Sequence, residues 1–253
     1  MREYIISDNE AGQRFDKYLA KLFKNAPSGL IFKQLRGKNI TLNKAKAKGN
    51  EKLKVKDVVQ VFMADDTIDK FTGNRVNDIK IYENMPFNVV YEDGNIIIAD
   101  KCAGVLSQKA KPSDISMNEL LLSYLIKSNR SGNISMAFTP AFCNRLDRNT
   151  SGIVVAGKSV VGLQEMSAAF HDRTIKKYYI CIVKGRVSKR VHIKGWLRKD
   201  ADVNKVNVVK NIPQGAGMDD YTAIETEYFP VCISDEVSLV KVHLITGKTH
   251  QIR

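Results

Sequence analysis

The sequence of 253 residues contains no closely spaced cysteines, and this absence limits its chemistry. Its cysteines are scattered, with no Cys-x-x-Cys pair, at positions Cys102, Cys143, Cys181 and Cys232. A structural zinc site normally uses closely spaced pairs of ligands, so we predict no metal site. Scattered cysteines of this kind are typical of reduced, partly buried residues in a cytoplasmic protein.

The sequence also lacks long apolar runs, internal repeats and low-complexity tails. No stretch approaches the roughly 20 apolar residues of a membrane-spanning helix, so we expect none. The N-terminal segment Met1–Asp8 is too short and too acidic for a signal peptide. We therefore expect a cytoplasmic location.

What the sequence does have is a large excess of basic residues. Lysine and arginine number 40 against 27 aspartate and glutamate residues, which gives a formal net charge of +13. Such an excess favours an anionic partner, either nucleic acid or an acidic membrane surface, although it also serves solubility alone. The uneven distribution of the charge is more informative than its total.

Residues 1–63 are predicted to form a small α/β domain with two helices and short strands. The apolar face of the first helix is formed by Phe15, Tyr18, Leu19, Leu22 and Phe23. Ser28 is predicted to cap the N-terminus of a second helix, which ends at Gly37. Strands are predicted at residues 40–42 and 58–62, around a lysine-rich loop.

Basic residues are concentrated between positions 33 and 57, where only Glu51 and Asp57 oppose them. They are Lys33, Arg36, Lys38, Lys44, Lys46, Lys48, Lys52, Lys54 and Lys56. Charge alone would be better explained by a solvated lysine face. Two helices followed by a basic strand-turn-strand segment favour a nucleic-acid-binding surface instead, and the candidate contacts are Lys33, Arg36, Lys38, Lys44 and Lys46.

The rest of the chain is predicted to be a polar linker at residues 64–84 and a second domain at 85–253. Strands at 88–91 and 95–99 flank a turn at Glu92–Gly94, and Ser116 with Glu119 forms a capping box that opens a helix. Strands dominate the second half without regular alternation with helices. This pattern favours an α+β fold with a mixed, mainly antiparallel central sheet and flanking helices.

The motif at Arg145–Gly152 places the carboxylate of Asp147 between Arg145 and Arg148. An aspartate with an unperturbed pKa of about 3.9 is ionised at neutral pH, and a neighbouring arginine favours the charged form further. Such an anion can serve as a nucleophile or base beside a polyanion. A surface salt bridge or a turn-forming aspartate explains most Arg-Leu-Asp tripeptides.

The longer pattern R-L-D-x-x-T-S-G at residues 145–152 resembles the catalytic motif of the RluA-type pseudouridine synthases, which isomerise uridine in structured RNA. Further segments are similar to family motifs in the same order, namely Tyr91–Gly104, Lys177–Gly185 and Thr246–Arg253. Residues 1–63 resemble the S-four-like RNA-binding domain in their opening Gly12–Leu19 and in the segment Ile40–Asn43. The resemblance implies the pseudouridine synthase fold, no metal or organic cofactor, and a monomer that acts on RNA, without a membrane partner. An S-four-like domain before this catalytic type implies large-subunit ribosomal RNA.

The resemblance also implies roles for individual residues. Asp147 is the catalytic carboxylate, which assists cleavage of the bond between the uracil nitrogen and ribose. Tyr179 matches the active-site tyrosine that stacks on uracil and relays a proton, although a tyrosine in a strand is also explained as part of a sheet core. Arg253 matches the arginine that pairs with the carboxylate. Arg145 and Arg148 are assigned to RNA binding.

Three departures from the family pattern are visible. Asn144 stands where many members have histidine before Arg-Leu-Asp, and Cys102 stands where proline is usual. The last motif normally continues into further strands and a helix, whereas the sequence stops at Arg253. We therefore expect C-terminal elements to be missing, with lower stability or activity than in a longer parent.

Two other functions stay open at this point. One is an RNA-binding protein whose synthase domain is inactive or truncated. The other is a glycosidase or nucleosidase, but these hydrolases usually need two acidic groups at a defined separation. Only Asp147 is acidic in the motif cluster, which makes this second alternative the weaker one.

Overall fold

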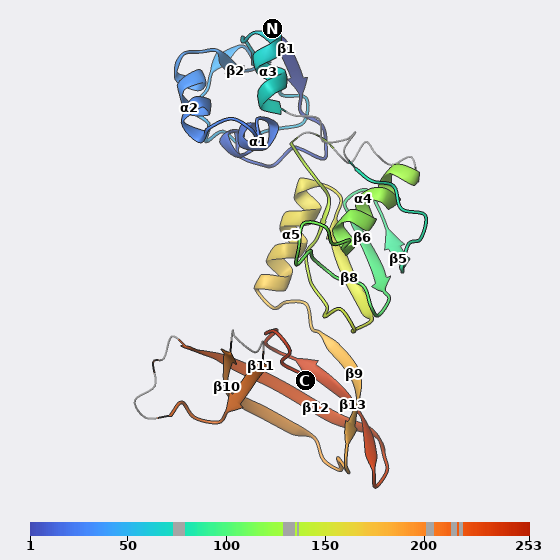
Figure 1. Cartoon of the computed structure of the whole chain (residues 1–253). Helices are drawn as coiled ribbons and strands as arrows, with labels where there is room; N and C mark the ends of the chain where they lie inside the picture. The colour runs from blue at the N-terminus through green and yellow to red at the C-terminus, as the bar shows by residue number, and fades with distance from the viewer. Residues whose placement is uncertain (73–78, 129–134, 136, 201–204, 214–216, 218–219) are drawn as a thin grey trace. The chain divides into compact units, whose positions relative to one another are not determined.

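The computed structural model describes residues 1–72, 79–128, 135, 137–200, 205–213, 217 and 220–253. The chain divides into two compact units, residues 1–170 and 171–253, and each is described by itself (Figure 1). Residues 73–78 of the predicted linker lie outside the described residues. In the described part, no helix has both the length and the apolar composition needed to cross a membrane.

The first unit begins with a small module of helices around an antiparallel sheet. Its strands are β1 (Arg2–Ile5), β2 (Ile40–Leu42), β3 (Ala45–Lys46) and β4 (Val58–Val61), in the order β1-β4-β2-β3. Its helices are α1 (Phe15–Leu22), α2 (Ser28–Arg36) and α3 (Asp65–Thr72). The expected face of α1 is confirmed, because Phe15, Tyr18, Leu19 and Leu22 are all buried in the module core.

Two details of this module differ from the sequence analysis. Pro27, not Ser28, is the N-cap of α2, because Pro27 has extended backbone angles and the helix already includes Ser28. Part of the polar stretch 64–84 is helix α3, whose Ile68 is fully buried in the module core. Acidic residues in the first turn of α3, Asp65 and Asp66, suit the positive end of a helix dipole. One buried isoleucine was too weak a signal to separate this helix from a linker.

The first unit continues with a second antiparallel sheet, in the order β5-β6-β8-β7. Its strands are β5 (Phe87–Glu92), β6 (Ile96–Lys101), β7 (Ala141–Phe142) and β8 (Gly152–Gly157). Helices α4 (Met117–Lys127) and α5 (Val160–His171) flank this sheet (Figure 1). Leu121 and Leu125 of α4 pack on Ile97 and Ala156 of the central strands. The capping box of α4 is confirmed, since Glu119 accepts hydrogen bonds from the amide and hydroxyl of Ser116.

The turn between β5 and β6 makes stability depend on pH through Asp93. Its carboxylate accepts hydrogen bonds from the amides of Ile96 (2.8 Å) and Asn95 (2.7 Å), which lower the pKa of Asp93 below its ordinary value. A lowered folded-state pKa means that this contribution is present above the unfolded-state pKa of about 3.9 and is lost as pH falls through the folded-state pKa. We expect Asp93→Asn to melt a few degrees lower than the parent at neutral pH, with the gap closing in acid. Melting curves across pH, with exposed Asp100→Asn as the control, check this; a gap independent of pH would contradict it.

The second unit is a five-stranded antiparallel sheet in the order β11-β10-β12-β13-β9. Its strands are β9 (Tyr178–Lys184), β10 (Val191–Asp200), β11 (Lys205–Val209), β12 (Tyr221–Ile233) and β13 (Val237–Leu244). Strand β12 carries an irregularity between Pro230 and Cys232, where its register against β13 shifts. The predicted α+β class with antiparallel sheets is confirmed, and its strands after residue 85 are divided between two sheets. The predicted boundaries 1–63, 64–84 and 85–253 stay a prediction.

Candidate active-site segments and basic surface

The loop of residues 143–151, here called the Asp147 loop, connects the neighbouring strands β7 and β8. Its start is held by Asn144, whose Nδ2 donates to the carbonyl of Ile153 at 3.2 Å and whose Oδ1 accepts from the amide of Val155 at 2.8 Å. This position needs one donor and one acceptor, and an amide side chain supplies both. Asn144, one of the departures from the family pattern, therefore has a structural role here.

Ser107 fixes the residue directly before Asp147. The Oγ of Ser107 accepts from the amide of Leu146 at 3.0 Å and donates to the carbonyl of Leu146 at 2.6 Å. Ser107 is buried, and the side chain of Leu146 packs on the apolar core under the sheet. The backbone at Leu146 is thus held on both its polar groups and through its side chain.

Lys101 fixes the residue directly after Asp147. This lysine is fully buried, and its Nζ donates to the carbonyls of Cys102 (3.0 Å), Val105 (3.0 Å) and Arg148 (3.2 Å). We call this arrangement the Lys101 clamp. It is reinforced by Gly104, whose amide donates to the carbonyl of Arg148 at 2.8 Å. The three N–H donors of the ammonium group match three carbonyl acceptors, so each donor has a backbone partner.

Electrostatics couple the Lys101 clamp to Asp147. Burial lowers the pKa of Lys101, and the negative charge of Asp147 acts in the opposite direction. The clamp therefore supplies both backbone position and positive charge to the Asp147 loop.

Asp147 itself is partly buried at the start of a turn, where its carbonyl accepts from the amide of Thr150 at 3.0 Å. The loop ends at Gly152, whose φ of +130° lies in a region that side chains rarely adopt. The backbone conformation thus explains why the last position of the R-L-D-x-x-T-S-G motif is a glycine. The loop presents one carboxylate on a backbone that is fixed before and after it.

The two arginines of the motif are exposed on either side of Asp147. Nη1 of Arg145 donates to Gln108 Oε1 at 3.1 Å, and Nε of Arg148 donates to the carbonyl of Gly104 at 3.0 Å. Arg148 also lines a cavity of about 460 Å³, together with residues such as Gly104 and Asp114. Their exposed guanidinium groups can contact an anionic ligand next to the loop.

The tyrosine assigned to the active site lies on strand β9 in the second unit. Tyr179 is partly buried and is paired in register with Val242 of β13. Tyr178 points to the other face, where it is exposed and stacks on His243 with ring centroids 4.8 Å apart. The two tyrosines therefore lie on opposite faces of the strand.

The terminal segment Thr246–Arg253 is anchored to strand β12 through two side chains. The hydroxyl of Thr246 accepts from the amide of Glu225 at 2.8 Å, and Nε2 of Gln251 donates to Thr226 Oγ1 at 2.8 Å. Arg253 is exposed and its amide donates to the carbonyl of His250 at 3.0 Å. A Cβ on Gly247 would lie 3.0 Å from Nζ of Lys177, so this segment also approaches the start of the Tyr179 strand.

The four sequence motifs therefore occur as two pairs. The first unit brings Lys101–Gly104 together with the Asp147 loop, and the second brings Lys177–Gly185 together with Thr246–Arg253. Asp147 belongs to the first unit, and Tyr179 and Arg253 belong to the second. Their joint action stays a prediction.

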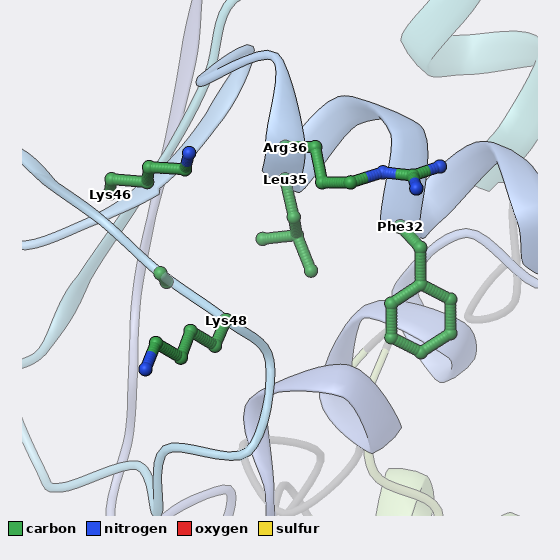
Figure 2. Close-up of a pocket in the computed structure, with 6 residues that line it drawn as sticks. Phe32, Leu35, Arg36, Lys46 and Lys48 are labelled. Carbon is green, nitrogen blue, oxygen red and sulfur yellow. The ribbon is translucent and has the colours of Figure 1, made fainter.

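The candidate RNA contacts of the N-terminal module are all exposed, namely Lys33, Arg36, Lys38, Lys44 and Lys46. Arg36 and Lys46 border a cavity of about 480 Å³ between α2 and the β3 segment, with Lys48 beside them (Figure 2). Phe32, which lines the same cavity, and Lys101 were given no role from the sequence. Among the residues that the structure describes, no cluster of histidine, cysteine, aspartate or glutamate has an arrangement that could hold a metal ion.

Comparison with known proteins identifies the family. The family model described as RNA pseudouridylate synthase matches residues 95–253, from β6 through the second unit. The chain belongs to this family of RNA-modifying enzymes, and it is an RNA pseudouridine synthase.

Relatives match over nearly the whole chain. A ribosomal large subunit pseudouridine synthase C of Buchnera aphidicola is 31% identical, with 98% of this chain and 74% of that protein covered. An uncharacterised RNA pseudouridine synthase of Mycoplasma genitalium is 29% identical, with 99% and 76% covered. The structure of human RNA pseudouridylate synthase domain containing 1 matches with a TM-score of 0.52 at 19% identity, covering 67% of this chain and 63% of that one, which supports the fold.

Proposed function

We propose that this protein converts uridine to pseudouridine in large-subunit ribosomal RNA, with Asp147 as the catalytic carboxylate. The observation that carries the proposal is the fixed backbone on both sides of Asp147. Ser107 holds Leu146 and the Lys101 clamp holds Arg148, so one carboxylate is presented from a loop that cannot shift freely. A reacting group fixed in this way contributes through position as well as charge.

In the proposed reaction, one carboxylate assists the cleavage of one bond to ribose and the formation of another. The bond between uracil N1 and ribose C1′ breaks, the ring turns, and C5 bonds to C1′ while the C5 proton leaves and N1 gains a proton. We propose that Asp147 either attacks the sugar or helps to deprotonate it, and that its negative charge offsets positive charge on the sugar as the base departs. The reaction is an isomerisation and consumes no co-reactant.

Residues of the second unit and the two arginines of the Asp147 loop complete the proposal. We assign to Tyr179 stacking on uracil and relay of the C5 proton through its hydroxyl. We assign to Arg253 the pairing with the Asp147 carboxylate, and to Arg145 and Arg148 contact with the RNA around the extruded nucleotide. The support for these assignments is the match to the family motifs, together with the exposure of Arg145 and Arg148.

The RNA target is proposed from the N-terminal module and from the relatives. We propose that residues 1–63 are an S-four-like domain that binds RNA phosphates through Lys33, Arg36, Lys38, Lys44 and Lys46. Relatives with names that specify the large ribosomal subunit match over 98% of this chain, including the module. We further propose that the protein is a cytoplasmic monomer that needs no cofactor, in keeping with its scattered, unpaired cysteines.

Mapping of pseudouridine in RNA tests this substrate assignment. The purified chain is incubated separately with transcripts of large-subunit and small-subunit ribosomal RNA, and each transcript is mapped for new pseudouridines. We expect discrete new sites in the large-subunit transcript only. Modification of the small-subunit transcript alone would refute the target, and RNA binding without any new site would favour an RNA-binding protein with an inactive synthase domain.

A further inference from the structure

The cavity in the N-terminal module combines an apolar floor, an exposed aromatic ring and a basic rim. Its volume is about 480 Å³, and it is lined by Phe32, Leu35, Arg36, Lys46, Ala47 and Lys48. Small-ligand sites have volumes of roughly 300–1,000 Å³, so this space suits one nucleotide-sized group. We refer to it below as the Phe32 cavity.

Helix periodicity places three of these residues on one face of α2. Phe32, Leu35 and Arg36 are separated by three and four residues, which brings them side by side on a helix. Figure 2 shows Leu35 pointing into the space between the helix and the β3 segment, with the ring of Phe32 to one side. Leu35 is buried, whereas 47% of Phe32 is exposed. The helix therefore supplies both the floor of the cavity and a ring with a free surface.

The opposite wall is formed by the chain that leaves strand β3. Lys46 and Lys48 are two residues apart, and the small buried Ala47 between them completes the floor. Glu51 fixes this wall, since its carboxylate accepts from the amides of Lys48 and Gly49, both at 2.7 Å. A Cβ on Gly49 would lie 3.3 Å from Leu35 Cδ1 and 3.8 Å from Phe32 Cε1, so the wall approaches the helix closely.

Charge complementarity identifies the kind of occupant. The rim carries Arg36, Lys46 and Lys48, and no acidic residue lines the cavity in the described part of the chain. The acidic residues of this stretch are used elsewhere: Glu51 binds backbone amides, and Asp57 accepts from Asn43 Nδ2 and the amide of Lys54. An aromatic ring within a positively charged groove is the usual arrangement for a single-stranded nucleic acid, with bases on the ring and phosphates on the cations.

We propose that the Phe32 cavity binds the base of one unpaired RNA nucleotide, stacked on Phe32, with its phosphates beside Arg36, Lys46 and Lys48. Bases in an A-form duplex are stacked inside the helix and cannot reach this ring, whereas bases in loops and bulges can. The module then recognises an unpaired position next to a duplex, largely regardless of base identity. The inference rests on the proposed function only in taking RNA as the ligand.

Binding of RNA hairpins by the full chain tests this proposal. We use an end-labelled hairpin with one bulged nucleotide and the fully paired hairpin, and measure fluorescence anisotropy. We expect the parent to bind the bulged hairpin about tenfold more tightly, and we expect Phe32→Leu to lose this preference. Phe32→Tyr keeps a stacking ring and should bind like the parent.

The chain offers a matched control in Phe62, which belongs to the same module, is 46% exposed and does not line the cavity. Phe62→Leu should keep the preference for the bulge. Equal preference in Phe32→Leu and the parent, or equal loss in Phe32→Leu and either Phe32→Tyr or Phe62→Leu, would overturn the proposal. Lys46→Gln should instead weaken binding of both hairpins and reduce the dependence on salt by about one ion.

This test can fail independently of the proposed function, because it measures hairpin binding, whereas the proposed function is measured by the formation of pseudouridine. If the chain converts uridine but its preference for the bulged hairpin does not depend on Phe32, the proposed function stands and this inference is wrong. If the preference for the bulged hairpin depends on Phe32 but no uridine is converted, this inference stands and the proposed catalytic activity is wrong.

Discussion

Substitution of Asp147 by asparagine is expected to lower the rate of uridine isomerisation by about 10³-fold or more, because no other group can replace the reacting carboxylate. Asparagine keeps the size of aspartate and one acceptor oxygen, but its second oxygen is replaced by an NH2 donor, it carries no charge and it is not a nucleophile. The folded structure of the loop should survive, since its fixed points are Ser107 and the Lys101 clamp. Release of tritium from RNA labelled at uracil C5, followed under single-turnover conditions, measures this rate.

Controls separate loss of chemistry from loss of binding. Asp147→Asn should bind RNA with an affinity close to that of the parent, because the proposed phosphate contacts are the exposed basic residues. Asp66→Asn removes an exposed carboxylate from helix α3 and should release tritium at the parental rate. A fall of less than about tenfold in Asp147→Asn would exclude Asp147 as the reacting carboxylate.

Replacement of Lys101 by methionine is the second large effect that we expect. Methionine fills similar space but leaves the carbonyls of Cys102, Val105 and Arg148 without the ammonium donor, in a site where the lysine is fully buried. An unsatisfied buried polar group costs about 1–3 kcal/mol, and partial relaxation limits the sum. We expect the free energy of unfolding to fall by about 3 kcal/mol in denaturant titrations.

The effect of Lys101→Met on activity can be measured separately from its effect on stability, in conditions where the variant is folded. Loss of the clamp leaves the carbonyl of Arg148 held by the amide of Gly104 alone, and misplacement of a reacting group by about 1 Å can cost about 10²-fold in rate. We expect folded Lys101→Met to show a lower kcat with little change in KM. Lys127→Met, an exposed lysine on α4, should change neither quantity. Parental stability and kcat in Lys101→Met would show that the clamp does not position the loop.

Local signals predicted much of the fold. The spacing of Phe15, Tyr18, Leu19 and Leu22 marked helix α1, and the Ser116–Glu119 box marked the start of α4. These features depend on neighbours within a few residues, which the sequence displays directly. Helix α3 was missed because its pattern is short and polar, and only its packing on the module core reveals Ile68 as buried.

Contacts between residues far apart in the chain could not be predicted from the sequence. Strands β10 and β12 carry polar and charged residues, and their pairing becomes evident only from register: Lys194 lies opposite Glu225, and the side chain of His192 bonds Glu225 at 2.7 Å. The contacts that hold the Asp147 loop could not be predicted for the same reason. Family motifs indicated Asp147, whereas the role of Lys101 depends on its contact with a carbonyl 47 positions away along the chain. Phe32 was missed because helix spacing shows its neighbours on α2 but not the opposite wall at Lys46–Lys48.

The central claim is that this chain rearranges uridine and does not hydrolyse it, and one measurement tests this most directly. RNA labelled with tritium at uracil C5 is incubated with the purified chain, after which released tritium, pseudouridine in the digested RNA and free uracil are quantified together. The account predicts one pseudouridine for each tritium released, with no free uracil. Free uracil in place of pseudouridine, or no change in the RNA despite binding, would contradict it.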